Sequence, residues 1–410
     1  MLTASRVVEA DEVLRELLAG PAGNSDPYPL LRHLRELAPV HRSDLDGVWY
    51  ASDYRTVKQL LLDRRVGKSP AGFSKRFGLN EELVRRIRER QQPSMIVANP
   101  PEHGRLRKAA RGPFLPGRME GRLQQRIEEI VDERLDVVAA KGDADMMADV
   151  AFKLPVTVIG ELVGVPPEDR DEFPALVDDF FEAGQMGATT EQMARADRAV
   201  ERFRDYFSGL VEGQRAHPGP DLVGALVADG NLDDDELQGT ITLVFIAGFI
   251  TTANLIGNGL LALFRHPSEM ARLWADPGLV PNAVEEMLRF DTPVQLIERK
   301  ALEDLEVGGQ VIPAGDVIIT LLGAANRDPA QFADPDRLDL GRPDAGAHIA
   351  FAWGIHHCLG APLARLEGQL VLTRLRDRFS RLELLDPDPK HRPGFGIRSL
   401  ASLPIGFVSR

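Results

Sequence analysis

The stretch Phe351-Ala-Trp-Gly-Ile-His-His-Cys-Leu-Gly360 contains the only cysteine of the 410 residues. Pro362 and leucines at 359, 363, 366 and 370 follow at helical spacing, so the pattern predicts a helix that begins just after Cys358. The free N–H groups and the positive dipole end of a helix N-terminus lower a cysteine pKa and can donate hydrogen bonds to a thiolate. Such a sulfur is suited to bind a metal.

Four interpretations of Cys358 compete. A zinc site with His356 and His357 is disfavoured, because structural zinc uses several Cys and His ligands and no second cysteine exists. A nucleophilic cysteine needs a base, and the sequence places no histidine to serve it. A buried structural cysteine leaves the aromatic and glycine residues of the loop unexplained. A single thiolate as axial ligand of haem iron explains the most residues.

The same ten residues closely resemble the haem-binding loop of the cytochrome P450 superfamily, F-G-x-G-x-H-x-C-x-G. Ala352 stands in place of the first glycine, which requires a negative φ at this residue. The resemblance implies that Cys358 is the axial ligand of haem b. It also implies that Phe351, His356 and Gly360 are cofactor-binding positions of the loop. Further matches run from about residue 99 to residue 360, so they cover nearly the whole chain.

Composition predicts one large domain over residues 1–410, because no linker, low-complexity segment or repeat divides the chain. A hydrophobic content of 43% supports a substantial core, and the net charge of −13 argues against nucleic-acid binding. One cysteine excludes an intramolecular disulfide, and the N-terminus lacks the basic and apolar regions of a signal peptide. We therefore expect a cytoplasmic protein.

The segment from Thr240 to Phe264 has no charged residue and is long enough to span a membrane. It contains threonines, asparagines and glycines, lies in the middle of the chain and has no second such segment beside it. These features favour a buried helix, so we expect no membrane contact.

The segment from residue 64 to residue 90 carries nine basic and three acidic side chains. Charge runs usually face water, which favours a solvated surface. By the resemblance, this segment is the mobile loop that covers the substrate pocket. Binding of an anionic substrate or an acidic carrier protein therefore stays open as an alternative.

His103 and Arg107 lie four residues apart in a predicted helix whose first turn contains proline. By the resemblance they bind a haem propionate, together with Arg299 and His356. Arg105, Lys108 and Arg111 project elsewhere on this helix and are candidates for the patch that receives an acidic ferredoxin.

Asp233 and Glu236 predict the N-terminal cap of a long helix over about residues 233–264. Its middle, Ala247-Gly-Phe-Ile-Thr-Thr252, resembles the oxygen groove A-G-x-E/D-T-T of the family. Ala247 and Gly248 are small residues that let the helix bulge, and Thr251 and Thr252 are the catalytic hydroxyl groups. Ile250 occupies the place of the acid that commonly delivers protons. We expect Thr251, Thr252 and waters held partly by the substrate to replace it.

Glu286 and Arg289 are three residues apart, which at a surface would be worth only ~0.2–0.5 kcal/mol. By the resemblance they form a buried structural cluster with Arg342 that locks the haem loop. The predicted substrate pocket is lined by Met95, Ile96, Phe181, Met186, Ile246, Ile250, Val294, Leu296 and Phe395.

These expectations combine into a mainly α cytochrome P450-type domain with small β-sheets, in which haem lies between the central helix and residues 351–360. The implied function is monooxygenation of a small organic substrate, a natural product or secondary metabolite, by hydroxylation or epoxidation. Electrons would come from NAD(P)H through ferredoxin and ferredoxin reductase, and the protein would be a monomer. Oxidative coupling, peroxide-driven oxidation and a non-oxygenating haem sensor remain as alternatives.

Overall fold

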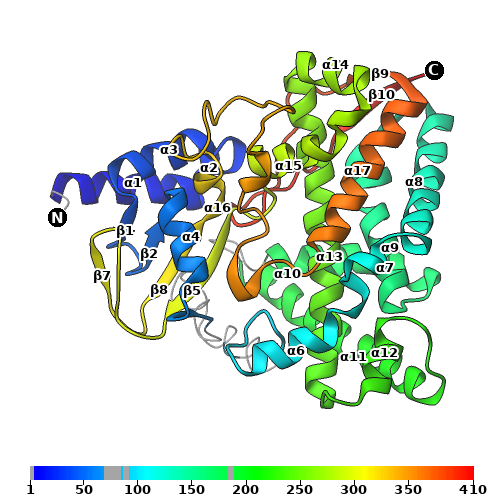
Figure 1. The fold of residues 1–410 in the computed structure, drawn as a ribbon, viewed down its shortest axis with the longest axis horizontal. Coiled ribbons are helices and arrows are strands. Elements are labelled where there is room, and N and C mark those ends of the chain that lie inside the picture. Colours follow the sequence, from blue (N-terminus) through cyan, green and yellow to red (C-terminus); the bar gives the residue numbers. More distant parts are fainter. Residues whose placement is uncertain (1–3, 69–84, 86–91, 183–188) are drawn as a thin grey trace.

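The structure, a computed structural model, describes residues 4–68, 85, 92–182 and 189–410. Helices dominate the half of the molecule that contains α8 to α15 and α17; β1, β2, β5, β7 and β8 lie beside the N-terminal helices, whereas β9 and β10 lie near α14 and α17 (Figure 1). The larger helices are α1 (Ala4–Ala19), α3 (Tyr28–Leu37), α4 (Tyr54–Leu62), α6 (Glu102–Ala110), α8 (Arg122–Lys141), α9 (Lys153–Val163), α10 (Phe173–Glu182), α11 (Thr190–Ala216), α12 (Leu222–Asp229), α13 (Asp234–Arg265), α14 (Pro267–Ala275), α15 (Val280–Phe290) and α17 (Ala361–Arg378). The short helices are α2 (Pro21–Ser25), α7 (Pro116–Met119) and α16 (Leu322–Ala325).

The central helix α13 organises the helical half (Figure 1). It begins with a capping box, in which the Asp233 side chain accepts from the N–H of Glu236 and the Glu236 side chain accepts from the N–H of Asp233. The predicted helix start is therefore confirmed. Helices α9, α15 and α17 pack against α13, and most of its apolar stretch is buried by them. This burial accounts for the apolar character of α13 without a membrane.

Three small sheets complete the fold. The largest has the strand order β1 (Val40–Arg42), β2 (Trp49–Ala51), β8 (Val317–Leu321), β5 (Leu296–Ala301) and β3 (Val66–Gly67), with β2 parallel to β8 and the other pairs antiparallel. The second consists of β4 (Asp143–Asp145), β10 (Pro404–Ser409) and β9 (Phe379–Leu384). The third is a hairpin of β6 (Leu305–Val307) and β7 (Gln310–Ile312). The pair Gly308-Gly309 between two short apolar runs predicts such a two-residue turn, and the two glycines have φ of +57° and +73°.

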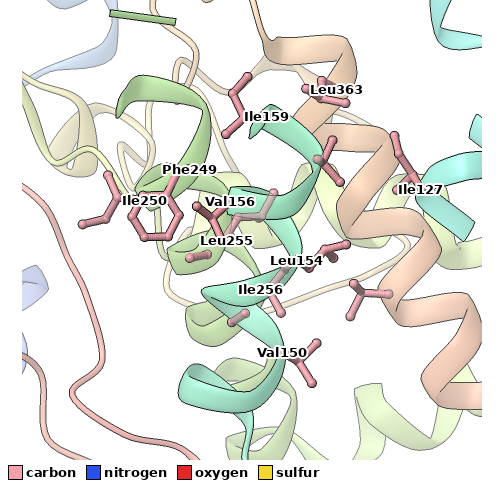
Figure 2. Packing of buried hydrophobic residues seen from close by; sticks show 14 of the residues in the cluster. Ile127, Val150, Leu154, Val156, Ile159, Phe249, Ile250, Leu255, Ile256 and Leu363 are labelled. Atoms are coloured by element: carbon pink, nitrogen blue, oxygen red, sulfur yellow. The ribbon is translucent and has the colours of Figure 1, made fainter. Parts of the chain in front are cut away.

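The main hydrophobic core lies where α8, α9, α13 and α17 meet. Figure 2 shows part of it, with Val156 and Ile159 of α9, Phe249 of α13 and Leu363 of α17. Two further clusters pack around the five-stranded sheet, one with α4 and the other with α1 and α3. Helix α17, which follows Cys358, is thereby fixed to the same core as α13.

Two expectations about local structure have different outcomes. Residues 247–252 are α-helical throughout, so the predicted bulge in α13 is wrong. The hydroxyl groups of Thr251 and Thr252 instead bond to carbonyls one turn back, within an unbroken helix. The glycines at residues 184 and 187 also predict a helix break over about residues 184–190. Most of this segment falls on residues 183–188, which lie outside the described part of the chain.

Candidate active site

Cys358 lies between a short 3₁₀ turn (Gly354–His356) and the start of α17. Its backbone N–H donates to the carbonyl of Phe351 at 2.9 Å, which closes the loop. The side chain is accessible, although burial by the surrounding protein raises the pKa of the thiol. The N–H groups of Gly360 and Ala361 and the positive charge of Arg107 act in the opposite direction. The sulfur is therefore accessible and has nearby donors for a thiolate.

Ala352 has a φ of +56°, so the expected negative φ is wrong. The loop makes the same left-handed turn that glycine makes in the family pattern, and alanine adopts it at a cost of ~1–2 kcal/mol. Gly354 has a φ of +75°, and a Cβ added there would lie 2.3 Å from the carbonyl oxygen of Leu61. The loop therefore packs directly against the backbone of α4, and glycine is required at residue 354.

One side of α13 is accessible near the middle of the helix. Ala247 is exposed and Thr251 is partly exposed, although most of the neighbouring residues in the helix are buried. The Thr251 hydroxyl donates to the carbonyl of Ala247 at 2.8 Å, and the Thr252 hydroxyl donates to Gly248 at 3.3 Å. Each hydroxyl oxygen keeps its lone pairs to accept a further hydrogen bond. Ile250 is 3% exposed and belongs to the core cluster (Figure 2).

Two histidines from distant segments of the chain lie in contact. The rings of His103 on α6 and His356 in the cysteine loop have centroids 4.3 Å apart. The Nε2 atoms of both are buried and have no hydrogen-bond partner among the described residues. Burial lowers the pKa of His356 to about 2, and Lys68, Arg299, His103 and Arg107 add repulsion in the same direction. These basic groups and unpartnered nitrogens form a site that suits an anion.

Arg299 and Lys68 supply further positive charge. Their side chains donate to the same carbonyl, that of Glu298, from Nη1 at 2.9 Å and from Nζ at 3.4 Å. Burial lowers the pKa of Lys68 well below its ordinary value, and the charge of Arg299 lowers it further. Within the described residues, no carboxylate forms an ion pair with His103, Arg107, Arg299, His356 or Lys68. The two propionates of haem would supply the missing carboxylates.

The residues fit both the iron and the propionates of haem. Cys358 offers a sulfur for the iron, and the basic groups with their two unpartnered Nε2 atoms offer donors for the propionates. No group of three His, Cys, Asp or Glu side chains in the described parts of the chain could hold a metal ion, which argues against the zinc interpretation.

Sequence reasoning missed Lys68 as a site residue. It was grouped with the basic stretch 64–90, most of which lies outside the described residues. Lys68 follows β3, which pairs with β5 so that Gly67 lies opposite Lys300, next to Arg299. Only strand pairing across more than 200 residues brings Lys68 and Arg299 together, and no local sequence signal encodes it.

The predicted cluster of Glu286, Arg289 and Arg342 is brought together and buried. Arg289 donates to Glu286 from Nε at 2.6 Å and from Nη2 at 2.8 Å, and Arg342 Nε donates at 3.2 Å. The two arginines also donate to carbonyls at residues 326, 333, 334, 335 and 337. This cluster ties α15 to the irregular segment that precedes the cysteine loop.

The predicted pocket residues separate into groups. Met95, Ile246 and Ile250 are at most 8% exposed, whereas Ile96 is 45% exposed. Phe181, Val294 and Leu296 are partly exposed, and Met186 lies outside the described residues. Phe395 is 4% exposed and packs in the cluster of α1, α3, β2 and β8. Its place in the substrate pocket stays a prediction.

The predicted ferredoxin patch on α6 is smaller than expected. Arg105 forms an ion pair with Glu236 and donates to the carbonyl of Asn231, so its charge is already used. Lys108 and Arg111 are exposed, and neither forms an ion pair within the described part of the chain.

Comparison with known proteins agrees with this geometry. The family profile "Cytochrome P450" matches residues 278–402. The monooxygenase PikC of Streptomyces venezuelae is 39% identical, over 93% of this chain and 91% of that protein. The 6-deoxyerythronolide B hydroxylase of Saccharopolyspora erythraea is 37% identical, over 93% of this chain and 96% of that protein.

Solved structures show the same fold. The crystal structure of P450BioI, in complex with an acyl carrier protein that holds hexadec-9Z-enoic acid, superposes with a TM-score of 0.87. It is 34% identical in sequence, and the match covers 93% of this chain and 98% of that one. Sequence identity above 30% over nearly the full length of both chains leaves one assignment: this chain belongs to the cytochrome P450 family and is a haem-thiolate monooxygenase.

Proposed function

We propose that this enzyme inserts one atom of O₂ into a small natural product, by hydroxylation or epoxidation, with haem b as its cofactor. The observation that carries the proposal is the set of basic side chains around His103 and His356, whose buried Nε2 atoms have no partner among the described residues. Lys68, Arg107 and Arg299 act on His356 and have no ion-paired carboxylate in the described part of the chain. A porphyrin with two propionates would satisfy these groups, and its iron would bind the accessible Cys358.

When bound, haem with a thiolate ligand supplies the activation of O₂, because the sulfur donates electron density that favours O–O cleavage. The residues of this chain do the rest. The N–H groups of Gly360 and Ala361 stabilise a charged sulfur, and His103, Arg107, Arg299, His356 and Lys68 would orient the propionates. Thr251 presents a hydroxyl oxygen that can accept a proton from one side and pass one on.

The substrate class is proposed from the relatives and from accessible apolar side chains. PikC is named a cytochrome P450 monooxygenase, and the name of the second relative says that it hydroxylates 6-deoxyerythronolide B. In this chain, Ile96, Val294 and Leu296 present accessible apolar surface. These three side chains would favour the binding of an apolar secondary metabolite.

Electrons are proposed to arrive from NAD(P)H through ferredoxin reductase and ferredoxin, with the enzyme working as a cytoplasmic monomer. Lys108 and Arg111 are exposed and form no ion pair with the residues that the structure describes, which supports an acidic partner at α6. P450BioI was crystallised with an acyl carrier protein, so a carrier-bound substrate is a specific alternative to a free one.

The decisive experiment measures product and spectrum together. Reduced protein with CO should show the long-wavelength Soret band of a thiolate-ligated haem, and Cys358→His should abolish this band while haem is retained. Turnover of 6-deoxyerythronolide B and of hexadec-9Z-enoic acid, with surrogate ferredoxin and reductase, should add one oxygen atom to at least one of them.

Each alternative has its own readout. Loss of two hydrogens without gain of oxygen would indicate oxidative coupling. Product formed with peroxide but not with NAD(P)H would indicate peroxide-driven oxidation. Ligand binding without turnover of any compound would indicate a sensor.

A further inference from the structure

Asn99 lies just before α6 and forms hydrogen bonds with two of the residues assigned to the propionates. Its side chain pairs with the backbone of Lys68, because Oδ1 accepts from the Lys68 N–H at 2.8 Å and Nδ2 donates to the Lys68 carbonyl at 3.0 Å. Its own carbonyl accepts from the N–H of His103 at 2.9 Å, in the first turn of α6. One residue therefore joins Lys68 to the start of the helix that carries His103.

The chemistry of this contact requires an amide. An asparagine side chain has both an acceptor and a donor, so it can bond to the N–H and to the C=O of the same residue. Two such bonds are what a partner strand forms with one residue of an antiparallel pair. Strand β3 ends at Gly67, so Asn99 supplies the next backbone pairing with a side chain instead of a strand.

The contact is also close. A Cβ added at Gly67 would lie 2.5 Å from Asn99 Oδ1 and 2.8 Å from Leu302 Cδ1, so a larger residue would displace the asparagine. Gly67 itself lies opposite Lys300 in the pairing of β3 with β5. The Lys68 backbone is therefore fixed by β5 at the preceding residue and by Asn99 at Lys68 itself.

The fixed backbone decides what the Lys68 ammonium can reach. A lysine ammonium is a compact charge on a flexible four-carbon stem, so its position depends on where the backbone holds the stem. Nζ donates to the carbonyl of Glu298 at 3.4 Å, a long hydrogen bond that leaves room for a stronger partner. Burial lowers the pKa of His103 and of His356, and the charge of Lys68 lowers both further. The ammonium therefore acts on the same two imidazoles that await an anion.

We propose that Asn99 is a positioning residue for the cofactor, because it holds the Lys68 backbone on the first turn of α6 so that Lys68 and His103 bind the haem propionates together. Asn99 acts on haem through Lys68. A positive charge held beside haem also favours the reduced iron, so Asn99 contributes to the reduction potential in the same way. The proposal rests on the proposed haem-binding function.

The test is a double-mutant cycle of Asn99→Leu and Lys68→Met in the holoenzyme. Leucine is close to asparagine in size and forms neither hydrogen bond. Asn99→Leu should speed haem transfer to apomyoglobin by about three-fold to ten-fold, because the ammonium is no longer held at the propionates. The double variant should transfer haem at most about two-fold faster than Lys68→Met alone, because Asn99 then has no ammonium to position.

The midpoint potential separates positioning from a general loss of stability. Lys68→Met should lower the potential, since it removes a positive charge beside the iron. Asn99→Leu should lower it too, with no further decrease in the double variant. The matched control is Asn24→Leu in α2, which removes the hydrogen bond that Asn24 Oδ1 accepts from the Gly394 N–H at 2.8 Å. This control should keep the wild-type transfer rate and potential.

A crystal structure of the wild-type holoenzyme adds a test that needs no variant. It should show Lys68 Nζ at hydrogen-bond distance from a propionate oxygen while Asn99 holds the Lys68 backbone. A structure in which Nζ lies away from both propionates would overturn the role of Asn99, even if Asn99→Leu does not fold.

Two kinetic results would also overturn this role. One is an unchanged rate of haem transfer in Asn99→Leu. The other is an acceleration by Asn99→Leu that is equally large in the Lys68→Met background, because Asn99 would then act on the fold around haem and not on Lys68. If reduced wild-type protein with CO lacks the long-wavelength Soret band, the proposed haem-thiolate function fails, and the role of Asn99 fails with it.

Discussion

The Arg365 guanidinium donates two hydrogen bonds to the Glu285 carboxylate, from Nε to Oε1 at 2.7 Å and from Nη2 to Oε2 at 2.8 Å. Arg365 is on α17 and lies 4.6 Å from the centre of the Phe351 ring, in the cysteine loop. Glu285 is on α15, beside the buried cluster around Glu286. This bidentate pair therefore joins the helix that follows the cysteine to the helix that carries the structural cluster.

The pair should make stability sensitive to acid. Burial alone would raise the pKa of Glu285, but hydrogen bonds from His348 and Arg365 hold it at about 2. Burial lowers the pKa of His348, and its Nδ1 accepts from Ala350, so its neutral Nε2–H donates to Glu285. A carboxylate with a lowered pKa stabilises the fold above its ordinary pKa of 4.5 and loses this effect as pH falls toward 2.

We therefore expect Arg365→Gln to lower the free energy of unfolding by ~1.5–3 kcal/mol at pH 6. The difference from the wild type should shrink as pH falls through the range from about 4.5 to about 2. Urea unfolding at a series of pH values, followed by circular dichroism, measures both. A difference that stays constant with pH would show that the Glu285 carboxylate is not the group stabilised by Arg365.

Lys68 should hold the cofactor. We expect Lys68→Met to speed haem transfer to apomyoglobin by about ten-fold or more, because a charge-assisted hydrogen bond is worth ~1.5–3 kcal/mol. The matched control is Lys300→Met, whose side chain points to the face of β5 opposite Arg299. Equal rates of haem transfer from the two variants would show that Lys68 does not bind the cofactor.

The Glu286 cluster should be worth far more than a surface ion pair. Glu286 accepts from Arg289, Arg342 and the N–H of Asp339 and is 0% exposed. Glu286→Gln should lower the free energy of unfolding by ~3–5 kcal/mol, because it leaves buried arginines without a counter-charge. Glu191→Gln breaks the exposed pair with Arg198 and should cost only ~0–1 kcal/mol. Urea unfolding measures the free energy of unfolding of both variants. Similar decreases in Glu286→Gln and Glu191→Gln would refute the structural role of the cluster.

Ala352 should be a site of relievable backbone strain. Its φ of +56° suits glycine, so Ala352→Gly should raise the free energy of unfolding by ~0.5–1 kcal/mol. Ala350→Gly is the control in the same loop, where φ is not positive, and should lower it by ~0.5–1 kcal/mol. Thermal unfolding of the two variants measures these changes. A lower free energy of unfolding in both variants would mean that Ala352 is unstrained.

The α6 surface should control reduction by ferredoxin. The double variant Lys108→Glu, Arg111→Glu should slow electron transfer at low salt, and the effect should shrink above an ionic strength of ~0.1 M, where the Debye length is about 10 Å. Arg381→Glu, an exposed residue of β9 far from α6 in Figure 1, serves as the control. Stopped-flow reduction rates that respond equally to both changes would place the docking surface elsewhere.

The sequence by itself determined the parts of this protein that depend on local chemistry. A lone cysteine before a leucine-patterned helix, the capping box of Asp233 and Glu236, and the glycine pair at 308 and 309 each act over a few residues. The interactions that fix these features are local. The fold family, the start of α13 and the hairpin could therefore be predicted from the sequence. The His103 and Arg107 pair belongs here too, because i and i+4 positions share a helix face.

The tertiary structure decided what depends on segments far apart in the chain. Strand pairing moved Lys68 from a surface charge run to the side of Arg299, and packing placed Phe395 in the core and Arg105 against Glu236. The sign of φ at Ala352 was set by closure of a loop held on α4, which overrode the local preference of alanine. Burial, strand register and charge neutralisation depend on contacts between residues far apart in the chain. A single sequence does not show which residues make these contacts.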